Sequence, residues 1–459
     1  MVLLKQGYKY PLHIEKLGIN GEGIGYIERR LVFAPYALPG EDVLVKITEN
    51  APRFSRAEVL QVKTKSPDRV KAPDTTYAEL SSSHIMHLAY PAQLAFKTDL
   101  IRQSLQKYKP ENWQNIDVRP TLASAETIGY RYKLTYQVRK LKNGKVIAGL
   151  YKENSHHLVN LEHCLVQEAE SQEIANLICR LAEKYQLPIY DERHNQGLRT
   201  LMIRKSHATG EIQIVFVTSL ETLNLEKLVT DLTTAHPHIQ NIAVNFNPRK
   251  TSDIYGEKTW PLWRGDKAKD TITESALGTA FELSPRAFYQ LNPAQAEILY
   301  NEAAIALQPK KTDHLVDAYC GAGSIGLTLA KKVASVHGMD TIPESVNDAR
   351  DNAYALGFKN CHYEIGKAEK VISNMFKSGY KINSLIVDPP RTGLDDELLK
   401  TLVRYPLDKM VYISCNASTL AKDLRELTKI YRIDYIQSVD MFPHTARVEA
   451  VVRLTKKES

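Results

Sequence analysis

The chain has 459 residues, of which 43% are hydrophobic, and no apolar stretch approaches the roughly 18 residues that a membrane helix needs. Sixty Lys and Arg residues against 53 Asp and Glu residues give a net charge of +7, which suits a polyanionic partner and an ordinary surface equally well. Five scattered cysteines, with no CxxC pair, argue against a disulfide framework and a zinc knuckle. We therefore expect a cytoplasmic protein of two or three domains that crosses no membrane.

Residues 1–66 alternate short β-like runs with Gly and Pro turns, which predicts a small β-barrel. The stretches 21–26 and 38–43 resemble the TRAM domain, an OB-like RNA-binding module found on RNA-modifying enzymes. The segment carries only a slight excess of basic residues, so a structural barrel is the alternative reading.

The residue pattern in the middle of the chain predicts an α+β domain. Pro91 opens an amphipathic helix that runs to about residue 105, after a polar, irregular stretch. Further along, the pattern predicts helices near 170–185 and 220–235 and strands at 198–205, 211–218 and 239–245.

A basic β-hairpin is predicted at residues 131–152, with Asn143-Gly144 as a type I′ turn. This stretch contains seven basic and no acidic residues, interleaved with Tyr132, Tyr136 and Tyr151. Basic side chains bind phosphates and aromatic rings stack on unpaired bases, so the hairpin is a candidate RNA contact. A solvated hairpin face is the alternative.

After about residue 280 the pattern changes to β–α alternation. Apolar runs occur at 314–319, 333–339, 361–365, 384–388, 409–415 and 448–454, with helical stretches between them. This predicts a doubly wound, mostly parallel, Rossmann-like sheet whose ligands lie at the carboxyl ends of the strands.

The first of these strands leads into a glycine-rich loop. Gly321, Gly323 and Gly326 satisfy GxGxxG, and Asp340 follows at the end of the second strand, where a carboxylate can hold ribose hydroxyls. On this pattern alone, a dinucleotide and S-adenosylmethionine are equally good ligands.

Two later strand ends favour methyl transfer. The fourth strand ends at Asp388-Pro389-Pro390, where two prolines end the strand and stiffen the loop, and the fifth delivers Cys415. Together with Asp317 and Asp340, these side chains are predicted to converge on one crevice.

A cysteine in such a crevice can activate uracil. Carbon 5 of uracil is a weak nucleophile, but addition of a thiolate at carbon 6 makes carbon 5 an enolate carbon that can attack a sulfonium methyl group. A base must then remove the proton from carbon 5. Glu449, at the start of the apolar last strand, is the first candidate for this base, and His444 is the competing one.

Several stretches resemble the RNA 5-methyluridine methyltransferases, the group that includes the RumA and TrmA enzymes. They are residues 317–323, 388–391, 414–420, 442–445 with Glu449, and 281–292, which matches the segment that enters the catalytic domain. The resemblance extends from the amino-terminal barrel to about residue 455.

The resemblance implies a role for each matching residue. Cys415 is implied as the nucleophile and Glu449 as the base, and the implied contacts to S-adenosylmethionine are Gln290, Tyr319, Asp340 and Asp388. Asp388 lies near both cofactor and target base in this family, which leaves a role in orienting uracil open. Asp317 is then an anchor of the glycine loop, and Cys320 is interpreted as packing.

The chain departs from the RumA-like members at their iron–sulfur cluster. Those enzymes hold a cluster with four cysteines, whereas residues 79–88 contain none and Cys164 alone stands at a matching place. We therefore predict no cluster and no metal. A TRAM-like barrel without a cluster is similar to the branch from Gram-positive bacteria that methylates 23S ribosomal RNA, in some members at two uridines.

These inferences predict three domains. Residues 1–66 form a TRAM barrel, residues 67–90 and 121–280 a central RNA-binding domain, and residues 91–120 and 281–459 the methyltransferase domain, on which the Pro91 helix docks. The predicted partner is RNA, namely 23S rRNA, with no role for DNA and a monomer as the default state. Two alternatives stay open: a methyltransferase for the transfer-RNA T-loop, and a non-catalytic RNA-binding or assembly factor.

Overall fold

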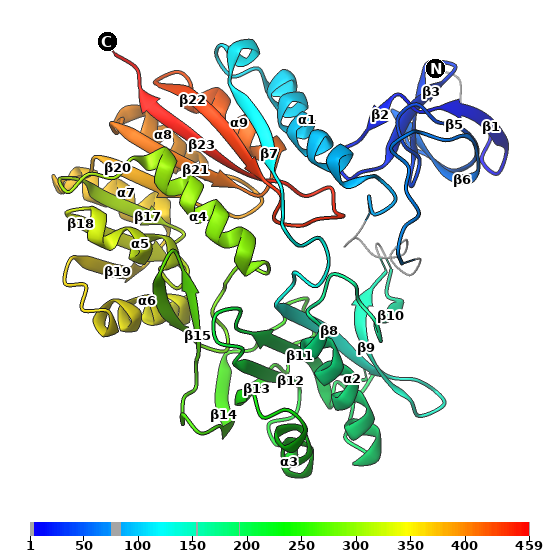
Figure 1. The fold of residues 1–459 in the computed structure, drawn as a ribbon, viewed down its shortest axis with the longest axis vertical. Helices are drawn as coiled ribbons and strands as arrows, with labels where there is room; N and C mark the ends of the chain where they lie inside the picture. Colours follow the sequence, from blue (N-terminus) through cyan, green and yellow to red (C-terminus); the bar gives the residue numbers. More distant parts are fainter. Residues whose placement is uncertain (1–3, 75–83, 153–154, 192, 459) are drawn as a thin grey trace.

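The computed structural model describes residues 4–74, 84–152, 155–191 and 193–458. Three β-sheets form the cores of three lobes, and the amino-terminal lobe stands apart at the upper right of Figure 1. In the described parts of the chain, no helix is long and apolar enough to span a membrane.

The amino-terminal lobe is a curved sheet of six strands in the order β1-β5-β6-β4-β3-β2. Its strands are β1 (Lys9–His13), β2 (Lys16–Leu17), β3 (Gly23–Ile27), β4 (Arg30–Ala34), β5 (Asp42–Asn50) and β6 (Phe54–Thr64). The strands curl tightly enough that a Cβ atom on Gly25 would lie 2.0 Å from the carbonyl oxygen of His13, so this position requires glycine. The β-barrel predicted for this segment is confirmed.

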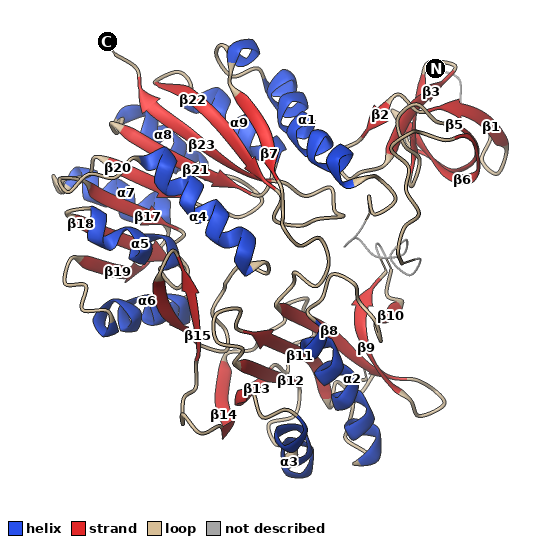
Figure 2. Cartoon of the chain, viewed as in Figure 1, coloured by secondary structure: helices blue, strands red, loops and turns tan. Residues whose placement is uncertain are grey.

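The central lobe consists of a β-sheet layer and a layer of helices, as the predicted α+β domain requires. Its seven strands run in the order β10-β9-β8-β11-β12-β13-β14 (Figure 2). They are β8 (Lys133–Lys140), β9 (Val146–Tyr151), β10 (Leu158–Asn160), β11 (Leu198–Lys205), β12 (Ile212–Thr218), β13 (Ile239–Phe246) and β14 (Lys258–Arg264). Helices α2 (Ala169–Lys184) and α3 (Glu226–Ala235) pack on one face of this sheet over a continuous apolar core.

The turn of the β8–β9 hairpin differs from the prediction. The N–H of Gly144 donates to the carbonyl oxygen of Leu141 (2.9 Å), and Gly144 has a φ of +88°, whereas Asn143 is not among the residues with positive φ. A type I′ turn needs positive φ at both of its central residues. The predicted type I′ turn is therefore wrong: the loop has one extra residue, and Gly144 alone takes the left-handed conformation.

The third lobe is an eight-stranded sheet in the order β19-β18-β17-β20-β21-β23-β22-β7. Its strands are β7 (Val118–Leu122), β17 (His314–Ala318), β18 (Ser335–Asp340), β19 (Cys361–Ile365), β20 (Ser384–Val387), β21 (Lys409–Ser414), β22 (Tyr431–Val439) and β23 (Glu449–Lys456). All neighbours are parallel except β23, which runs antiparallel to both β21 and β22. The predicted doubly wound, mostly parallel sheet is confirmed.

Helices cover both faces of this sheet and enclose two apolar cores. They are α1 (Tyr90–Tyr108), α4 (Pro293–Leu307), α5 (Ser324–Leu329), α6 (Pro343–Ala355), α7 (Ala368–Lys377), α8 (Asp396–Arg404) and α9 (Ala417–Leu427), with 3-10 turns at Trp113–Asn115 and Ala330–Lys332. The hairpin of β15 (Ile272–Ala276) and β16 (Thr279–Leu283) leads from the central lobe into α4 (Figure 1).

A segment far upstream in the sequence completes the third lobe. Helix α1 packs against α9, and β7 adds to the sheet as a parallel neighbour of β22 (Figure 1). The chain therefore crosses into the third lobe before it forms the central one. The exact residue boundaries of the domains stay a prediction.

Candidate active site

Five neighbouring strands of the third lobe bring the predicted site residues to one edge of the sheet. Strands β18, β17, β20 and β21 are parallel, and Asp340, Tyr319, Asp388 and Cys415 stand at or just past their carboxyl ends. Strand β23 is antiparallel, so its first residue, Glu449, lies at the same edge. With strands about 4.8 Å apart, the row spans about 19 Å.

Cys415 and Glu449, the proposed nucleophile and base, lie at the ends of two neighbouring strands. Ser414 pairs with Ala450 in the antiparallel register of β21 and β23, so Cys415, one residue after Ser414, and Glu449, one residue before Ala450, lie side by side at this edge. The two residues lie close together because β23 runs antiparallel to β21. Nothing in the sequence pattern indicates this direction of β23.

A single cavity of about 980 Å³ opens along this edge, a volume at the upper end of the range for ligand pockets. All six residues predicted as nucleophile, base or cofactor contacts line it: Gln290, Tyr319, Asp340, Asp388, Cys415 and Glu449. Asp317 does not line it, which corrects the expectation that this side chain joins the others in the crevice.

Asp317 instead supports the glycine loop from below. The side chain is buried, and its Oδ2 atom accepts a hydrogen bond from the N–H of Gly326 (2.8 Å). Burial raises the pKa of this carboxyl to about 7, and the nearby carboxylates of Asp388 and Asp340 act in the same direction. This geometry fits a structural anchor of the loop.

The opposite edge of the glycine loop is held by Asp340. Its two carboxylate oxygens accept hydrogen bonds from the N–H groups of Gly321 and Ile342, both at 3.0 Å. Gly321 has a φ of +54°, and a Cβ atom there would meet nothing within 4 Å, because the residue faces the cavity. The loop therefore leaves open space beside a fixed carboxylate.

The loop that carries Asp388 is tied to the start of α9. The carbonyl oxygen of Arg391 accepts hydrogen bonds from Asn416 Nδ2 (3.0 Å) and Thr419 Oγ1 (3.1 Å). These bonds fix Asp388 and Cys415 relative to each other, since Cys415 directly precedes Asn416. Burial raises the pKa of Asp388 to about 7.

The cysteine thiol is half-buried at the amino-terminal end of α9. Burial raises the pKa of Cys415, the carboxyl groups of Glu449 and Asp388 act in the same direction, and the guanidinium of Arg391 lowers it; the resulting pKa is about 11. A bound ligand that neutralises the negative charge of these carboxyl groups would lower the pKa of the thiol and so favour the thiolate.

Glu449 is 5% exposed, and burial raises its pKa well above the usual range for a carboxyl. His444, the competing base, does not line the cavity. Its Nδ1 atom lies 3.1 Å from Nε2 of Gln93 on α1, and its backbone N–H donates to Oε1 of the same glutamine (2.9 Å). Of the two candidates, Glu449 is therefore the one that lines the same cavity as Cys415.

The loop before Glu449, residues 440–447, is fixed by a buried ion pair that the sequence pattern does not indicate. Lys97 of α1 donates to Asp440 and to the carbonyl oxygen of Phe442 (2.9 Å), and Tyr90 donates to Asp440 Oδ2 (2.9 Å). Lysine at a core position of an amphipathic helix is a signal that could have pointed to this pair.

Several residues of the cavity wall received no role in the sequence reasoning, although some of them lie in the stretches that carry the family resemblance. They include Phe288, Tyr300, Lys367, Glu369, Arg391, Phe442 and Arg447. Phe442 and Arg447 belong to the 440–447 loop, so the residues fixed by Lys97 form part of the wall.

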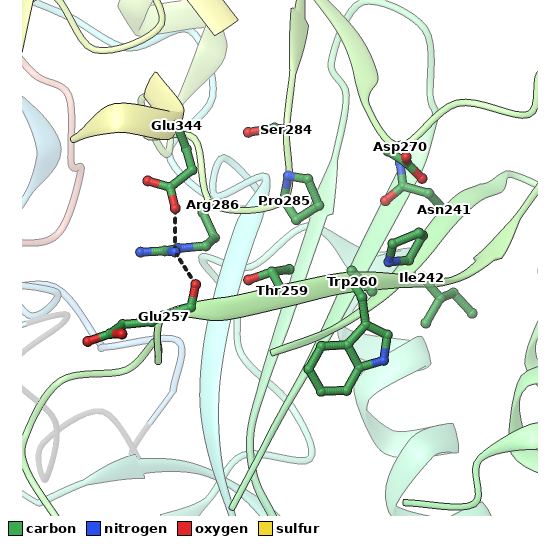
Figure 3. Close-up of a pocket in the computed structure, with 12 residues that line it drawn as sticks. Asn241, Ile242, Glu257, Thr259, Trp260, Asp270, Ser284, Pro285, Arg286 and Glu344 are labelled. Atoms are coloured by element: carbon green, nitrogen blue, oxygen red, sulfur yellow. Dashed lines mark hydrogen bonds and ion pairs between the residues drawn. The ribbon is translucent and has the colours of Figure 1, made fainter. Parts of the chain in front are cut away.

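A second, smaller cavity of about 250 Å³ lies between the central lobe and the third lobe (Figure 3). Arg286 crosses it, donating to Glu344 Oε1 (2.5 Å) and more weakly to the carbonyl oxygen of Glu257 (3.4 Å). None of the predicted site residues lines this cavity, and its one arginine is paired, so it serves as a junction between lobes.

The predicted loss of an iron–sulfur cluster concerns residues 79–88. Of these, 79–83 lie outside the described residues, and Cys164 packs beside Met86 and Tyr130. Within the described ranges, no three His, Cys, Asp or Glu side chains are grouped as metal ligands. The absence of a cluster stays a prediction.

Comparisons with known proteins agree with this geometry. Residues 266–457 match the family model for tRNA (uracil-5-)-methyltransferase, and residues 4–60 match the TRAM domain. An uncharacterized RNA methyltransferase of Lactococcus lactis is 58% identical over all of this chain and 93% of its own length. One from Streptococcus mutans is 52% identical over 99% of this chain and 98% of its own length.

Among solved structures, the tRNA (uracil-54, C5)-methyltransferase of Pyrococcus abyssi in complex with S-adenosyl-L-homocysteine is similar throughout. The TM-score is 0.76 with 27% sequence identity, and the match covers 97% of this chain and 99% of the other.

Proposed function

The chain belongs to the RNA (uracil-5-)-methyltransferase family, and from that premise we propose that it methylates carbon 5 of uridine in 23S rRNA through a covalent adduct of Cys415. The observation that carries this proposal is the placement of Cys415 beside Glu449 at the edge of the cavity. The chain is thus proposed to act as an enzyme rather than as a non-catalytic assembly factor.

The cavity suits S-adenosylmethionine, which supplies an electrophilic methyl group when it is bound. Gly321 leaves room where any side chain would intrude, and the carboxylate of Asp340 is oriented by two backbone N–H groups. We propose Asp340 as the contact to the ribose hydroxyls, with Gln290, Tyr319 and Asp388 as further contacts to the cofactor. The solved relative contains the demethylated product of this cofactor.

In the proposed reaction, the Sγ atom of Cys415 adds to carbon 6 of the uracil ring and forms a carbon–sulfur bond. The electron pair of the ring double bond moves toward carbon 4 and its oxygen, so carbon 5 becomes nucleophilic. S-adenosylmethionine held by the cavity residues would supply the methyl group, and the electrons of its methyl–sulfur bond would stay on the sulfur, which leaves as the neutral thioether. Burial and the carboxyl groups of Glu449 and Asp388 raise the thiol pKa to about 11, so we propose that substrate binding promotes formation of the thiolate. Arg391 at the cavity wall is the described cation that favours the thiolate.

Glu449 is the proposed base of the second half of the reaction. It takes the proton from carbon 5, the electrons re-form the ring double bond, and the carbon–sulfur bond breaks to release Cys415. A carboxyl with a raised pKa is a stronger base once ionised than an exposed glutamate. It also adds no negative charge beside the thiol while it is protonated.

The RNA target is the finer part of the proposal. The TRAM domain and the absence of cysteines from residues 79–88 support 23S rRNA, by resemblance to the cluster-lacking branch. A tRNA target is the second candidate, because the solved relative is named for uracil 54 of tRNA and matches nearly the whole chain. We further propose that the basic β8–β9 hairpin contacts the RNA.

The deciding experiment supplies methyl-labelled S-adenosylmethionine and compares 23S rRNA fragments with transfer RNA as acceptors. We expect labelled 5-methyluridine in the 23S fragments and none in the Cys415→Ala variant, which should still bind RNA. Label in transfer RNA alone would transfer the proposal to the second candidate, and label retained by Cys415→Ala would refute the covalent route.

A further inference from the structure

Helix α9 carries an acidic side chain on its buried face. Asp423 is 2% exposed, and its neighbours on this face, Leu420, Leu424 and Leu427, pack in one of the two cores of the third lobe. Burial of a carboxylate is costly unless hydrogen bonds compensate it, so an acidic residue at such a position calls for a specific role. Asp423 does not line the active-site cavity, and any role in the reaction is therefore indirect.

Asp423 joins the loop after Asp388 to the strand that leads to Cys415. Its Oδ2 atom accepts hydrogen bonds from the backbone N–H of Leu394 (2.8 Å) and from the hydroxyl of Tyr412 (2.7 Å). Tyr412 is fully buried on β21, three residues before Cys415. Burial raises the pKa of Asp423, and these two hydrogen bonds oppose the rise. One oxygen atom therefore connects three elements: α9, β21 and the loop.

The loop packs tightly against Asp423. Gly393 has a φ of +82°, and a Cβ atom on it would lie 2.5 Å from Oδ2 of Asp423 and 3.3 Å from the Cβ atom of Thr419. A side chain at Gly393 would therefore displace the loop or the carboxyl group. The N–H of Gly393 also donates to the carbonyl oxygen of Pro390 (2.9 Å), so the chain makes a tight turn at this contact.

Two further residues of α9 hold the same loop. Asn416 and Thr419 both donate to the carbonyl oxygen of Arg391. Together with Asp423 they are spaced three and four residues apart, and residues at this spacing lie on one side of a helix. We call Asn416, Thr419 and Asp423 the α9 clamp. It binds the loop at two points, Arg391 and Leu394.

The loop held by the α9 clamp is a wall of the active-site cavity. All residues from Asp388 to Asp396 line this cavity, and so does Cys415, which directly precedes the residues of α9. A shift of the loop along α9 would therefore change the position of Asp388 relative to Cys415. A misplacement of about 1 Å caused by a change outside the reacting groups can cost about 100-fold in rate.

We propose that Asp423 is a positioning residue, which through Leu394 and Tyr412 sets the place of the 388–396 loop relative to Cys415 and thereby aligns the reacting groups. This inference rests on the proposed function for the reaction whose rate is measured. Because Asp423 lies behind the cavity wall, its loss should lower kcat without weakening the binding of RNA.

The test compares Asp423→Ala with Asp423→Asn and with a matched control, Asp313→Ala. An asparagine keeps one side-chain oxygen that can accept from both donors of Asp423. Asp313 is equally buried, at 2% exposure, and accepts hydrogen bonds from one backbone N–H and two side chains. It directly precedes β17, at the edge of the sheet opposite to the cavity, so Asp313→Ala reports the effect of losing a buried acceptor away from the loop.

Hydrogen-exchange mass spectrometry reports the contact without any reaction. The peptide that contains Leu394 should exchange at least about 5-fold faster in Asp423→Ala, as expected when one hydrogen bond is lost, and near the wild-type rate in the other two variants. Methyl transfer is then measured at saturating RNA and cofactor, below the unfolding transition. In Asp423→Ala, kcat should fall by about 10- to 100-fold while RNA affinity stays within about 2-fold of wild type, and Asp423→Asn should restore kcat to within about 3-fold.

Wild-type exchange in Asp423→Ala, faster exchange with an unchanged kcat, or an equal fall of kcat in Asp313→Ala would each overturn the positioning role. If Asp423→Ala does not fold, Thr419→Val removes another bond of the α9 clamp while keeping the shape of the side chain. It should change exchange and kcat in the same directions by about 5-fold, and wild-type values of both would overturn the proposal.

The two proposals fail in different ways. A wild-type protein that methylates no uridine in any RNA contradicts the proposed function alone, and hydrogen exchange then decides whether Asp423 holds the loop. A wild-type protein that methylates uridine, with Asp423→Ala equal to it in exchange and kcat, contradicts the positioning role alone.

Discussion

The buried ion pair between Lys97 and Asp440 gives the sharpest prediction about how the fold holds the site. Both side chains are 0% exposed, and Asp440 makes a further hydrogen bond to Tyr90. Lys97→Met fills much the same space but leaves the carboxylate of Asp440 in the core without its counter-charge. Breaking a buried pair in this way costs about 3–5 kcal/mol of unfolding free energy.

The double variant Lys97→Met/Asp440→Asn removes the remaining charge, and the asparagine can still accept from Tyr90. It should recover most of the lost stability, because replacing both members of a buried pair is often close to neutral. Lys107→Met serves as the matched control, since Lys107 is exposed on the same helix and should change stability by less than about 0.5 kcal/mol.

Urea unfolding followed by circular dichroism measures all four proteins. A loss below about 1 kcal/mol in Lys97→Met, or a double variant as unstable as the single one, would refute the reasoning from an uncompensated buried charge. Below the unfolding transition, Lys97→Met should also lower methyl transfer more than RNA binding, because Lys97 holds the loop that supplies Phe442 to the cavity wall.

Three further outcomes are expected. Glu449→Gln should transfer the methyl group but accumulate a covalent protein–RNA adduct on denaturing gels, and rapid release of product would point to another base. Asp317→Asn should reduce the loss of stability that wild type shows between about pH 4 and 7. In wild type, the carboxyl of Asp317 keeps its proton up to a pKa of about 7 in the folded state, whereas it ionises near about 4 in the unfolded state. The folded state therefore binds more protons, and wild type loses up to about 4 kcal/mol of unfolding free energy as the pH rises through this range. An unchanged pH profile in urea titrations would count against that assignment. Gly21→Val should loosen the barrel from the third lobe, because Gly21 has a φ of +86° and a Cβ atom there would lie 2.6 Å from the side chain of Ile85. Limited proteolysis would detect the loosened barrel, and a cleavage pattern like that of wild type would contradict the prediction.

The sequence pattern predicts the strands of the third lobe well because parallel strands buried on both faces read as continuous apolar runs. It also places Asp340, Asp388 and Cys415, since carboxyl ends of parallel strands share one edge. It does not predict that β23 runs antiparallel, because periodicity carries no direction, and Glu449 owes its position to that direction. The core position of Lys97 on its helix is only a weak signal for a related reason: a lysine on a helix is usually solvated, and its partner is 343 residues away.

The 440–447 loop connects the RNA-binding barrel to the chemistry. The N–H of Ile85 donates to the carbonyl oxygen of His444 (3.2 Å), and Gly21 of the barrel approaches both Ile85 and Ala446. On its other side, the loop leads through Val448 to Glu449, and α1 holds the loop through Lys97. The barrel therefore contacts the same loop that leads into the strand of the proposed base.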